Sequence, residues 1–429
     1  MNSKIKYYKN FFSRDFFHLF AVTLLSILPI LFFLGSGVLN LGIILLDLIL
    51  ITEIIKKRKY NFFKNYIFYS LIFLWLSFLI NVFFSIDPTN SLNRGFGFVR
   101  FIFFVMAILY YFNIKNEKYQ KIILTSWLII FCITTLDLIF ELINGKNILG
   151  FESYIHGRLA GFFNDELIIG HFYYAFLLIV ISFLLIKFSY KKIYVLRKEF
   201  NYKNFTYILI LLFLLISFFI GERSNFIKTL LMILLFTFMF EKKFYKLKLL
   251  LISLFFVCII TIINISDKYE KRFVNQFFNL YLTNPIENIV KSEHGGHYLT
   301  ALKIFDNNKI FGVGFRNYSE EIKKEKYKKF FYYQSIDPST HPHQIHFEFL
   351  SELGIFGYLS IITFMIYHFI QYFKNQKLNN ILNLSGFLFI ITSLLPILPS
   401  GSFFTSHAAT FFWINFAIMC LGQKKLDYS

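Results

Sequence analysis

Long apolar segments, separated by short polar connections, occupy most of the chain. Many of them reach the roughly 18 to 20 residues that a helix needs to cross the hydrocarbon core of a bilayer. About twelve such segments lie near residues 17–34, 37–55, 66–86, 95–113, 120–143, 166–186, 205–220, 224–240, 248–265, 347–370, 380–398 and 403–421. The pattern predicts an all-α, polytopic membrane protein with about 12 transmembrane helices.

The composition also indicates a membrane protein. Of the 429 residues, 56% are hydrophobic and only 16% are charged, whereas a soluble domain carries about 25% charged residues. Cys132, Cys258 and Cys420 all fall inside apolar segments. Their wide spacing favours buried small side chains over disulfides or a metal site.

The formal net charge of +19 is distributed in a way that indicates membrane topology rather than nucleic-acid binding. Lys and Arg gather in alternate connections, at residues 4–14, 56–59, 115–121, 187–203, 242–248, 374–377 and 424–425. Connections rich in Lys and Arg face the cytoplasm, so we expect both termini there. The expected organisation is transmembrane helices 1–9 in residues 1–265, an extracytoplasmic loop at 266–346, and transmembrane helices 10–12 in 347–429.

The predicted loop is long enough to carry structure of its own. Apolar side chains recur at helical spacing at Tyr298, Ala301, Leu302 and Phe305. This spacing predicts a short amphipathic helix over 297–306 that lies on the membrane surface. The basic, aromatic-rich residues 320–333 fit either a second interfacial helix near anionic headgroups or a plain solvated face.

Several polar residues near the outer ends of the apolar segments have more than one interpretation. Asp137 and Glu141 share a helix face, which suits a proton relay or a single wet face. Arg94 and Arg100 border a short outer connection and suit either lipid phosphates or interfacial anchoring. His407, on the same predicted side, is a candidate supporting residue.

The chain's most distinctive polar stretch is 337–357, which holds three histidines directly ahead of an apolar segment. Pro342 suits the first position of a helix, because proline has no amide to lose there. His343 would then lie in the first helical turn, where unpaired amides and the helix dipole favour an anion. A positive potential also keeps an imidazole neutral and able to accept a proton. His343 is therefore the candidate general base.

This stretch resembles the signature of the O-antigen ligase and polymerase family. In that signature a histidine, followed by a small amide or hydroxyl residue, opens a helix ending in Leu-x-Glu-x-Gly-x-x-Gly. The matching positions are His343, Gln344, Glu352, Gly354 and Gly357. Asn or Ser is more usual than Gln after the histidine.

Two further arginines are similar to family positions on the extracytoplasmic side. Arg158 precedes Gly161 and Asn164 at the entry to an apolar segment. Arg223 lies in the short hairpin 221–226, between two apolar segments. A planar guanidinium can bind two phosphate oxygens at once, so both residues are candidates for a phosphate ligand.

The segment ahead of the histidine motif also resembles the family, with a Gly-x-Gly-x-aromatic pattern at Gly312, Gly314 and Tyr318. Family members often carry an arginine a few residues before the preceding helix. Here His294 and His297 occupy that place. Arg316 or a loop lysine could supply the missing cation.

The resemblance implies a metal-independent, inverting glycosyltransferase without a cofactor. It would move a glycan from a polyprenyl-diphosphate carrier to an acceptor hydroxyl on the lipid A core, in lipopolysaccharide biosynthesis. His343 would be the general base, and Arg158 and Arg223 would stabilise the diphosphate. The implied substrate-binding residues are Arg316, Gln344, His294 and His297. The site would face the periplasm from a cell inner membrane.

Other functions stay open at the level of sequence. An O-antigen polymerase would join two lipid-linked repeat units, and a protein-glycosylating relative would differ only in its acceptor. A polysaccharide transporter or flippase also suits many membrane spans. A zinc site at His341, His343 and His346 is disfavoured, because residues two apart on a helix point in different directions. Arg223 could instead pair with Glu222 at the membrane interface.

Overall fold

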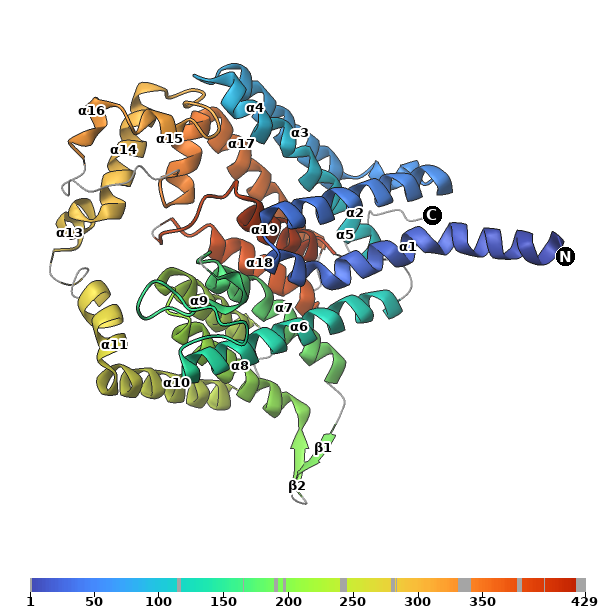
Figure 1. Cartoon of the computed structure of the whole chain (residues 1–429), viewed down its shortest axis with the longest axis horizontal. Coiled ribbons are helices and arrows are strands. Elements are labelled where there is room, and N and C mark those ends of the chain that lie inside the picture. The colour runs from blue at the N-terminus through green and yellow to red at the C-terminus, as the bar shows by residue number, and fades with distance from the viewer. Residues whose placement is uncertain are drawn as a thin grey trace.

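The computed structural model of the chain is a bundle of helices that surrounds a buried core (Figure 1). The structure describes residues 2–113, 117–164, 166–188, 192–195, 198–239, 245–278, 282, 284–330, 341–375, 380–396 and 398–421. The helices of the first part are α1 Asn2–Phe33, α2 Ser36–Lys57, η1 Tyr60–Phe63, α3 Tyr66–Phe83, α4 Pro88–Gly97, α5 Val99–Asn113, α6 Glu117–Asn144, η2 Gly161–Phe163, α7 Ile169–Phe188, α8 Tyr202–Phe219, α9 Arg223–Met239 and α10 Tyr245–Ile265. They continue with α11 Asp267–Tyr269, η4 Glu270–Phe278, α13 Pro285–Lys291, α14 Glu293–Asn307, α15 Tyr318–Glu321, α16 Glu325–Lys328, α17 Ile345–Asn375, α18 Ile381–Ser393 and α19 Ser406–Met419.

Each of the twelve apolar segments predicted from the sequence overlaps a helix. Within the described residues, seven helices are long and apolar enough to cross a membrane: Phe16–Phe33, Ser36–Lys57, Tyr66–Phe83, Pro88–Phe112, Lys118–Asn144, Ile169–Lys187 and Ile345–Lys374. An eighth would be the pair Ile252–Ile265 and Asp267–Asn275, which is bent by 101°. Helices such as Thr206–Phe219 and Ile381–Ser393 are apolar but shorter. The membrane class is confirmed, and the count of about twelve stays a prediction.

One short element departs from the expected all-α fold. Strands β1 (Lys192–Val195) and β2 (Lys198–Asn201) form an antiparallel hairpin between α7 and α8, with Lys192 opposite Asn201. The hairpin projects from the bundle (Figure 1).

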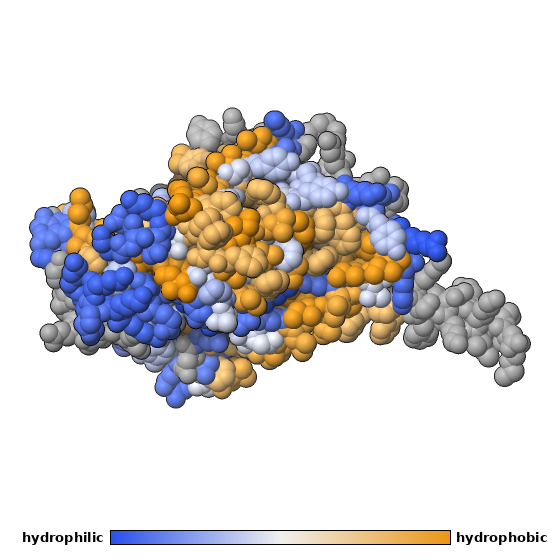
Figure 2. All heavy atoms as spheres, turned by 90° about the horizontal axis from the view of Figure 1, so that it is seen from above, coloured by the Kyte–Doolittle hydropathy of each residue, from blue (hydrophilic) through white to orange (hydrophobic). Residues whose placement is uncertain are grey.

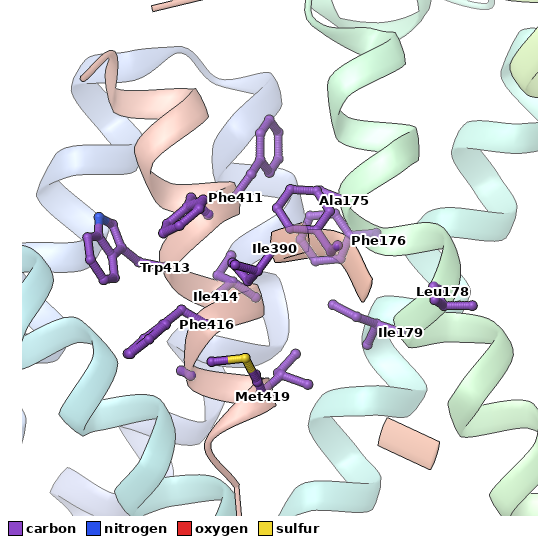
Figure 3. Close-up of a cluster of buried hydrophobic side chains, with 14 of the residues drawn as sticks. Ala175, Phe176, Leu178, Ile179, Ile390, Phe411, Trp413, Ile414, Phe416 and Met419 are labelled. Atoms are coloured by element: carbon purple, nitrogen blue, oxygen red, sulfur yellow. The ribbon is translucent and has the colours of Figure 1, made fainter. Parts of the chain in front are cut away.

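The bundle core is filled by aromatic and aliphatic side chains of α7, α18 and α19. Figure 3 shows Phe176, Ile390, Phe411 and Trp413 among the side chains that meet there. Apolar side chains also cover much of the outside, as on the face seen in Figure 2. Exposed apolar surface on this scale is expected where helices face lipid.

The predicted loop between α10 and α17 contains short helices and a small core of its own. Ala301, Ile304, Val313 and Tyr318 are buried together, with Phe347 of α17 packed against them. The helix predicted at 297–306 is confirmed as part of α14. Of its predicted apolar face, Ala301 is buried but Leu302 is 42% exposed, and the buried side of α14 packs on α17. Its placement on a membrane surface stays a prediction.

The basic segment after α14 is folded onto this small core where it is described. Tyr327 is fully buried, and Glu321 pairs with Lys324 and Lys326. These contacts give the segment a structural role in the loop. Residues 331–333 of the predicted interfacial helix lie outside the described residues.

Helix α17 is broken at Gly354, whose backbone has φ 63° and ψ −168°. The segment 309–314 runs alongside the break and supplies hydrogen bonds that the helix lacks there. The amides of Val313 and Gly314 donate to the carbonyls of Ser351 and Glu352, at 2.9 and 2.8 Å. On the other side of the break, the amides of Ile355 and Phe356 donate to the carbonyls of Lys309 and Ile310. A Cβ at Gly354 or Gly312 would collide with this crossing backbone.

Candidate active site

A cavity of about 1310 Å³ opens among α4, α5, the α8–α9 hairpin, α14, the start of α17 and the segment 398–409. Its lining is rich in positive charge. The charged side chains that line it are Arg94, Arg100, Arg158, Arg223, Lys228 and Arg316, with Glu166 and Glu222 as the acids. A cationic cavity in an otherwise apolar bundle favours an anionic ligand.

His343 lies on this cavity within a cluster of histidines. Its ring centroid is 4.4 Å from that of His341, 5.0 Å from that of His294 and 5.1 Å from that of His297. The cluster brings together two segments that are far apart in the sequence, the start of α14 and the residues before α17. Within the described residues, no group of three or more His, Cys, Asp or Glu side chains is arranged to hold a metal ion.

The backbone at His343 corrects the predicted start of the helix. Helix α17 begins at Ile345, and His343 precedes it with φ 57°, in the left-handed region. Pro342 therefore does not open the helix. The carbonyl of His343 accepts a hydrogen bond from the amide of Ser400, at 2.8 Å. A non-glycine residue in this conformation is strained and needs such support, and strain of this kind is common at functional sites.

Gln344 explains why the helix begins where it does. Its side-chain oxygen accepts hydrogen bonds from the amides of His346 and Phe347, at 2.7 and 3.0 Å, and so caps α17. Its amide nitrogen donates to the carbonyl of Pro396 at 2.8 Å. Gln344 is buried and does not line the cavity.

His346 faces away from the histidine cluster. Its Nε2 lies 2.8 Å from the carbonyl oxygen of Leu394, and its Nδ1 lies 3.2 Å from the hydroxyl of Tyr358. The rings of His341 and His343 do approach one another, because neither residue is on a helix. The prediction that His341 and His343 point in different directions, as residues two apart on a helix would, is therefore wrong. His346 nevertheless points away from both.

Burial keeps the histidines of the cluster neutral. It lowers the pKa of His343 to about 2, and the nearby His341, His294 and His297 lower that pKa further in the same direction. The pKa of His341 is lowered to about 4 by burial and by the adjacent Arg94. The pKa of His297 is lowered to about 4 by burial and the neighbouring His294. A neutral ring nitrogen at His343 can accept a proton.

The other predicted substrate-binding residues lie at different places around the cluster. His294 and the exposed Arg316 line the cavity. Arg316 has φ 62°, so a second cavity residue is held in the left-handed region. His297 is buried behind the lining, with its Nδ1 3.2 Å from the hydroxyl of Tyr318.

The segments that carry Arg158 and Arg223 are joined at the α8–α9 hairpin. The amide of Leu159 donates to the carbonyl of Ile220 at 3.1 Å, which joins the two segments. A Cβ at Gly221 would collide with the carbonyl oxygen of Gly157, so glycine allows this close approach. The structure therefore places both predicted arginines on one wall of the cavity.

Arg272 is a residue that sequence reasoning missed. Its Nε donates to the carbonyl of Gly221 at 2.7 Å and its Nη1 to that of His156 at 3.3 Å. Its own carbonyl accepts from Nη1 of Arg223 at 3.3 Å. Arg272 thus ties together the segments that carry Arg158 and Arg223. No local pattern in the sequence indicates these contacts.

Glu222 is buried rather than interfacial. Its carboxylate accepts hydrogen bonds from the amide of Gly170 at 3.0 Å and from the side chain of Asn225 at 2.6 Å. Burial raises the pKa of Glu222, and the nearby Arg158 opposes that rise. These contacts fix the hairpin against the start of α7.

Asp137 and Glu141 hold the segment that carries Arg158. The carboxylate of Glu141 accepts from the amides of Ala160 and Gly161, at 2.7 and 2.8 Å. Asp137 accepts from the amide of Ile148 at 3.0 Å. Both carboxylates are buried, and these bonds favour the positioning of a loop over a proton relay.

Lys228 and Ser224 are further missed residues on the Arg223 wall. Both donate to the carbonyl of Pro399, Lys228 at 3.5 Å. They are four residues apart on α9 and so share a face, a spacing that could have indicated their joint role. His407, the candidate supporting residue, lines the cavity and lies 3.8 Å from Glu166.

Residues 208–362 match the family model described as O-antigen ligase. The match includes Arg223, Arg272, His343 and Glu352, whereas Arg158 lies before it. Curated proteins gave no match to this chain. The resemblance inferred from the histidine motif is therefore confirmed for the part of the chain that carries this motif.

Proposed function

We propose that this chain, whose residues 208–362 belong to the O-antigen ligase family, moves a glycan from a polyprenyl-diphosphate carrier to an acceptor hydroxyl. The carrier class includes undecaprenyl diphosphate, and the acceptor is the lipid A core. The family supports a ligase- or polymerase-type glycosyltransferase of surface polysaccharide synthesis. The ligase reaction and its substrates are our proposal.

The observation that carries the proposal is the shared cavity of His343, Arg158 and Arg223. A glycosyl transfer of this kind needs a proton acceptor for the incoming hydroxyl and positive charge for the departing diphosphate. Two guanidiniums on one wall can bind several diphosphate oxygens by paired hydrogen bonds. His343 supplies the proton acceptor on the same cavity.

In the proposed mechanism, His343 takes the proton of the acceptor hydroxyl as its oxygen attacks the anomeric carbon. The bond from that carbon to the diphosphate oxygen breaks, and the leaving diphosphate keeps the electron pair. Attack from the side opposite to the diphosphate inverts the anomeric centre. Arg158 and Arg223 stabilise the leaving charge, and Arg272 and Glu141 hold these arginines in place.

The low pKa of His343 in the ligand-free protein gives donor binding a second role. A diphosphate beside the cluster would bring negative charge that favours the protonated imidazole, so it would raise the pKa of His343. A base whose pKa approaches the working pH accepts a proton more readily. The donor therefore strengthens the base that completes its own transfer.

From the positive-inside pattern we infer that this cavity faces the periplasm from an inner membrane. Nucleotide-activated sugars are absent there, so a lipid-linked donor is the substrate that fits. Metal-independent catalysis fits the arginines, which supply the positive charge that the leaving group needs.

The central test is glycan transfer by His343→Ala in membranes. Loss of transfer is expected with normal expression and insertion, because the proton acceptor of the proposed mechanism is removed. His346→Gln is the matched control, since His346 lies at the same helix start but faces Leu394. Transfer that survives His343→Ala, or that is lost only with His346→Gln, would refute the assignment of the base.

The surface glycans of a deletion strain separate the ligase from its alternatives. Free lipid-linked polymer indicates a missing ligase, and single repeats on the core indicate a missing polymerase. Lipid movement across liposomes without glycan transfer would indicate a flippase. Mass spectrometry of the glycans distinguishes the first two outcomes.

A further inference from the structure

The cations that line the cavity come from two separate parts of the fold. Arg158 and Arg223 form the donor site beside the α8–α9 hairpin. Arg94 and Arg100 come from α4 and α5, and Arg316 from the loop before α15. These three residues are called the second basic site. The segment 399–403 and the histidine motif lie between these two sites and contact both.

The segment 399–403 runs from the donor site past His343 to the second basic site. At the donor site, the carbonyl of Pro399 accepts a hydrogen bond from the hydroxyl of Ser224. Ser400 then donates to the carbonyl of His343 at 2.8 Å. The amide of Phe403 donates to the carboxylate of Glu348 at 2.8 Å. Glu352 follows one turn later on α17, and its carboxylate oxygen lies 3.9 Å from Nη1 of Arg94. His343 therefore lies between the two basic sites.

The acids near the second basic site do not line the cavity, whereas its arginines do. Neither Glu352, which faces Arg94, nor Asp47, which faces Arg100, lines the cavity. Glu348 is engaged by Ser402 and by the amide of Phe403. Because none of these acids lines the cavity, its lining stays positive here.

Two features distinguish Arg100 and Arg316 within the second basic site. The Nε of Arg100 is buried and has no hydrogen-bond partner among the described residues. A guanidinium in a membrane bundle is costly unless it is paired, so such residues usually serve a function. Arg316 is kept in the left-handed region at φ 62° although its side chain is exposed. Both side chains line the cavity, where an anion would compensate their charge.

We propose that Arg94, Arg100 and Arg316 bind a phosphate group of the acceptor glycan. This inference rests on the proposed function, because it takes His343 as the group that touches the acceptor hydroxyl. An acceptor that attacks opposite to the donor diphosphate extends beyond His343, toward these three arginines. A neutral sugar does not require them. The phosphate is either the diphosphate of a second carrier-linked glycan or a phosphate on a sugar of a core glycolipid.

The first experiment counts anion sites in the full chain, purified in nanodiscs. A labelled short-chain prenyl diphosphate and a labelled monosaccharide phosphate serve as the probes. Binding of two prenyl diphosphates indicates a carrier-linked acceptor, which is the polymerase reaction and replaces the lipid A core as the acceptor. Binding of one prenyl diphosphate together with one monosaccharide phosphate indicates a phosphorylated sugar. In both cases Arg316→Gln and Arg100→Gln weaken the second site by about tenfold, and Arg223→Gln weakens the first.

The outcomes separate the two levels of inference. One prenyl diphosphate bound, with no second site for either probe, overturns the second basic site and leaves the proposed function standing. No bound prenyl diphosphate overturns both. Retained prenyl diphosphate binding at the donor site shows that Arg316→Gln and Arg100→Gln have folded.

A kinetic experiment tests the same site during turnover. Arg316→Gln is expected to raise KM for a phosphorylated acceptor about tenfold while KM for the donor stays unchanged. With an acceptor that lacks the phosphate, wild type and Arg316→Gln should have equal KM values. An effect of Arg316→Gln that is the same for both acceptors would overturn the proposal.

Discussion

Replacing Arg223 with lysine tests whether the arginine binds the donor through its planar fork. Arg223 lines the cavity while its Nη1 donates to the carbonyl of Arg272 at 3.3 Å. Lysine keeps the charge but has a single nitrogen, which cannot bond this carbonyl and also present a fork to a diphosphate. The loss is expected to include at least one charge-assisted hydrogen bond.

The size of the effect follows from the value of such a bond. A hydrogen bond to a charged group contributes about 1.5–3 kcal/mol, and each 1.4 kcal/mol of lost transition-state stabilisation slows the reaction about tenfold. Arg223→Lys should therefore lower kcat/KM by about ten- to a hundredfold. An exposed ion pair is worth only about 0–1 kcal/mol, and lysine would replace such an arginine almost fully.

The assay is the initial rate of glycan transfer in membranes at matched protein levels. Arg58→Lys is the control, because Arg58 is an arginine on the predicted cytoplasmic side, after α2. It should leave the rate unchanged. Near-normal transfer by Arg223→Lys would refute the fork and leave Arg158 to bind the diphosphate.

Three other predictions address position, pH and topology. Glu141→Gln leaves one acceptor oxygen for the amides of Ala160 and Gly161, so it should displace Arg158 and lower the transfer rate about tenfold. Glu152→Gln, on the same loop, should leave the transfer rate unchanged. Equal rates for the two variants would contradict this role of Glu141. His297, His341 and His343 have pKa values lowered to about 4, 4 and 2, so below pH 6.5 the unfolded chain binds protons that the folded chain does not. Thermal stability should then fall from pH 6.5 to pH 4 by at most about 1.4 kcal/mol per pH unit for each histidine, and the fall should be smaller in His341→Gln; an unchanged slope would argue against neutral histidines. An impermeant thiol reagent should label Lys309→Cys and not Arg58→Cys from outside the cell, and the reverse pattern would place the cavity in the cytoplasm.

Local patterns in the sequence predicted much of the site. The apolar segments predicted where helices form, and the histidine motif with its two arginines predicted three residues that line one cavity. Each of these predictions depends on a short stretch of chain whose chemistry is visible in its own residues.

The predictions that failed depend on contacts between distant segments. Pro342 favours a helix start, but the side chain of Gln344 caps two amides, so α17 begins at Ile345. Leu302 fits an apolar stripe on α14, but the side of that helix which packs against Phe347 of α17 holds Ala301 and Ile304 and leaves Leu302 exposed. Arg272 supports the cavity wall that carries Arg158 and Arg223 through carbonyls of Gly221 and His156, and no spacing in the sequence relates these residues.

The break in α17 bears on how this protein can be recombined with its relatives. The glycine motif at Gly312 and Gly314 and the one at Gly354 and Gly357 are far apart in the chain. The backbone crossing at Gly354 nevertheless makes the two segments a single unit, because each supplies hydrogen bonds that the other lacks. A chimera that exchanges the predicted loop alone would take the two glycine motifs from different parents, and a mismatch between them would disturb the close backbone crossing. A loop exchange should therefore carry both glycine motifs from one parent, with its crossover placed after Gly357.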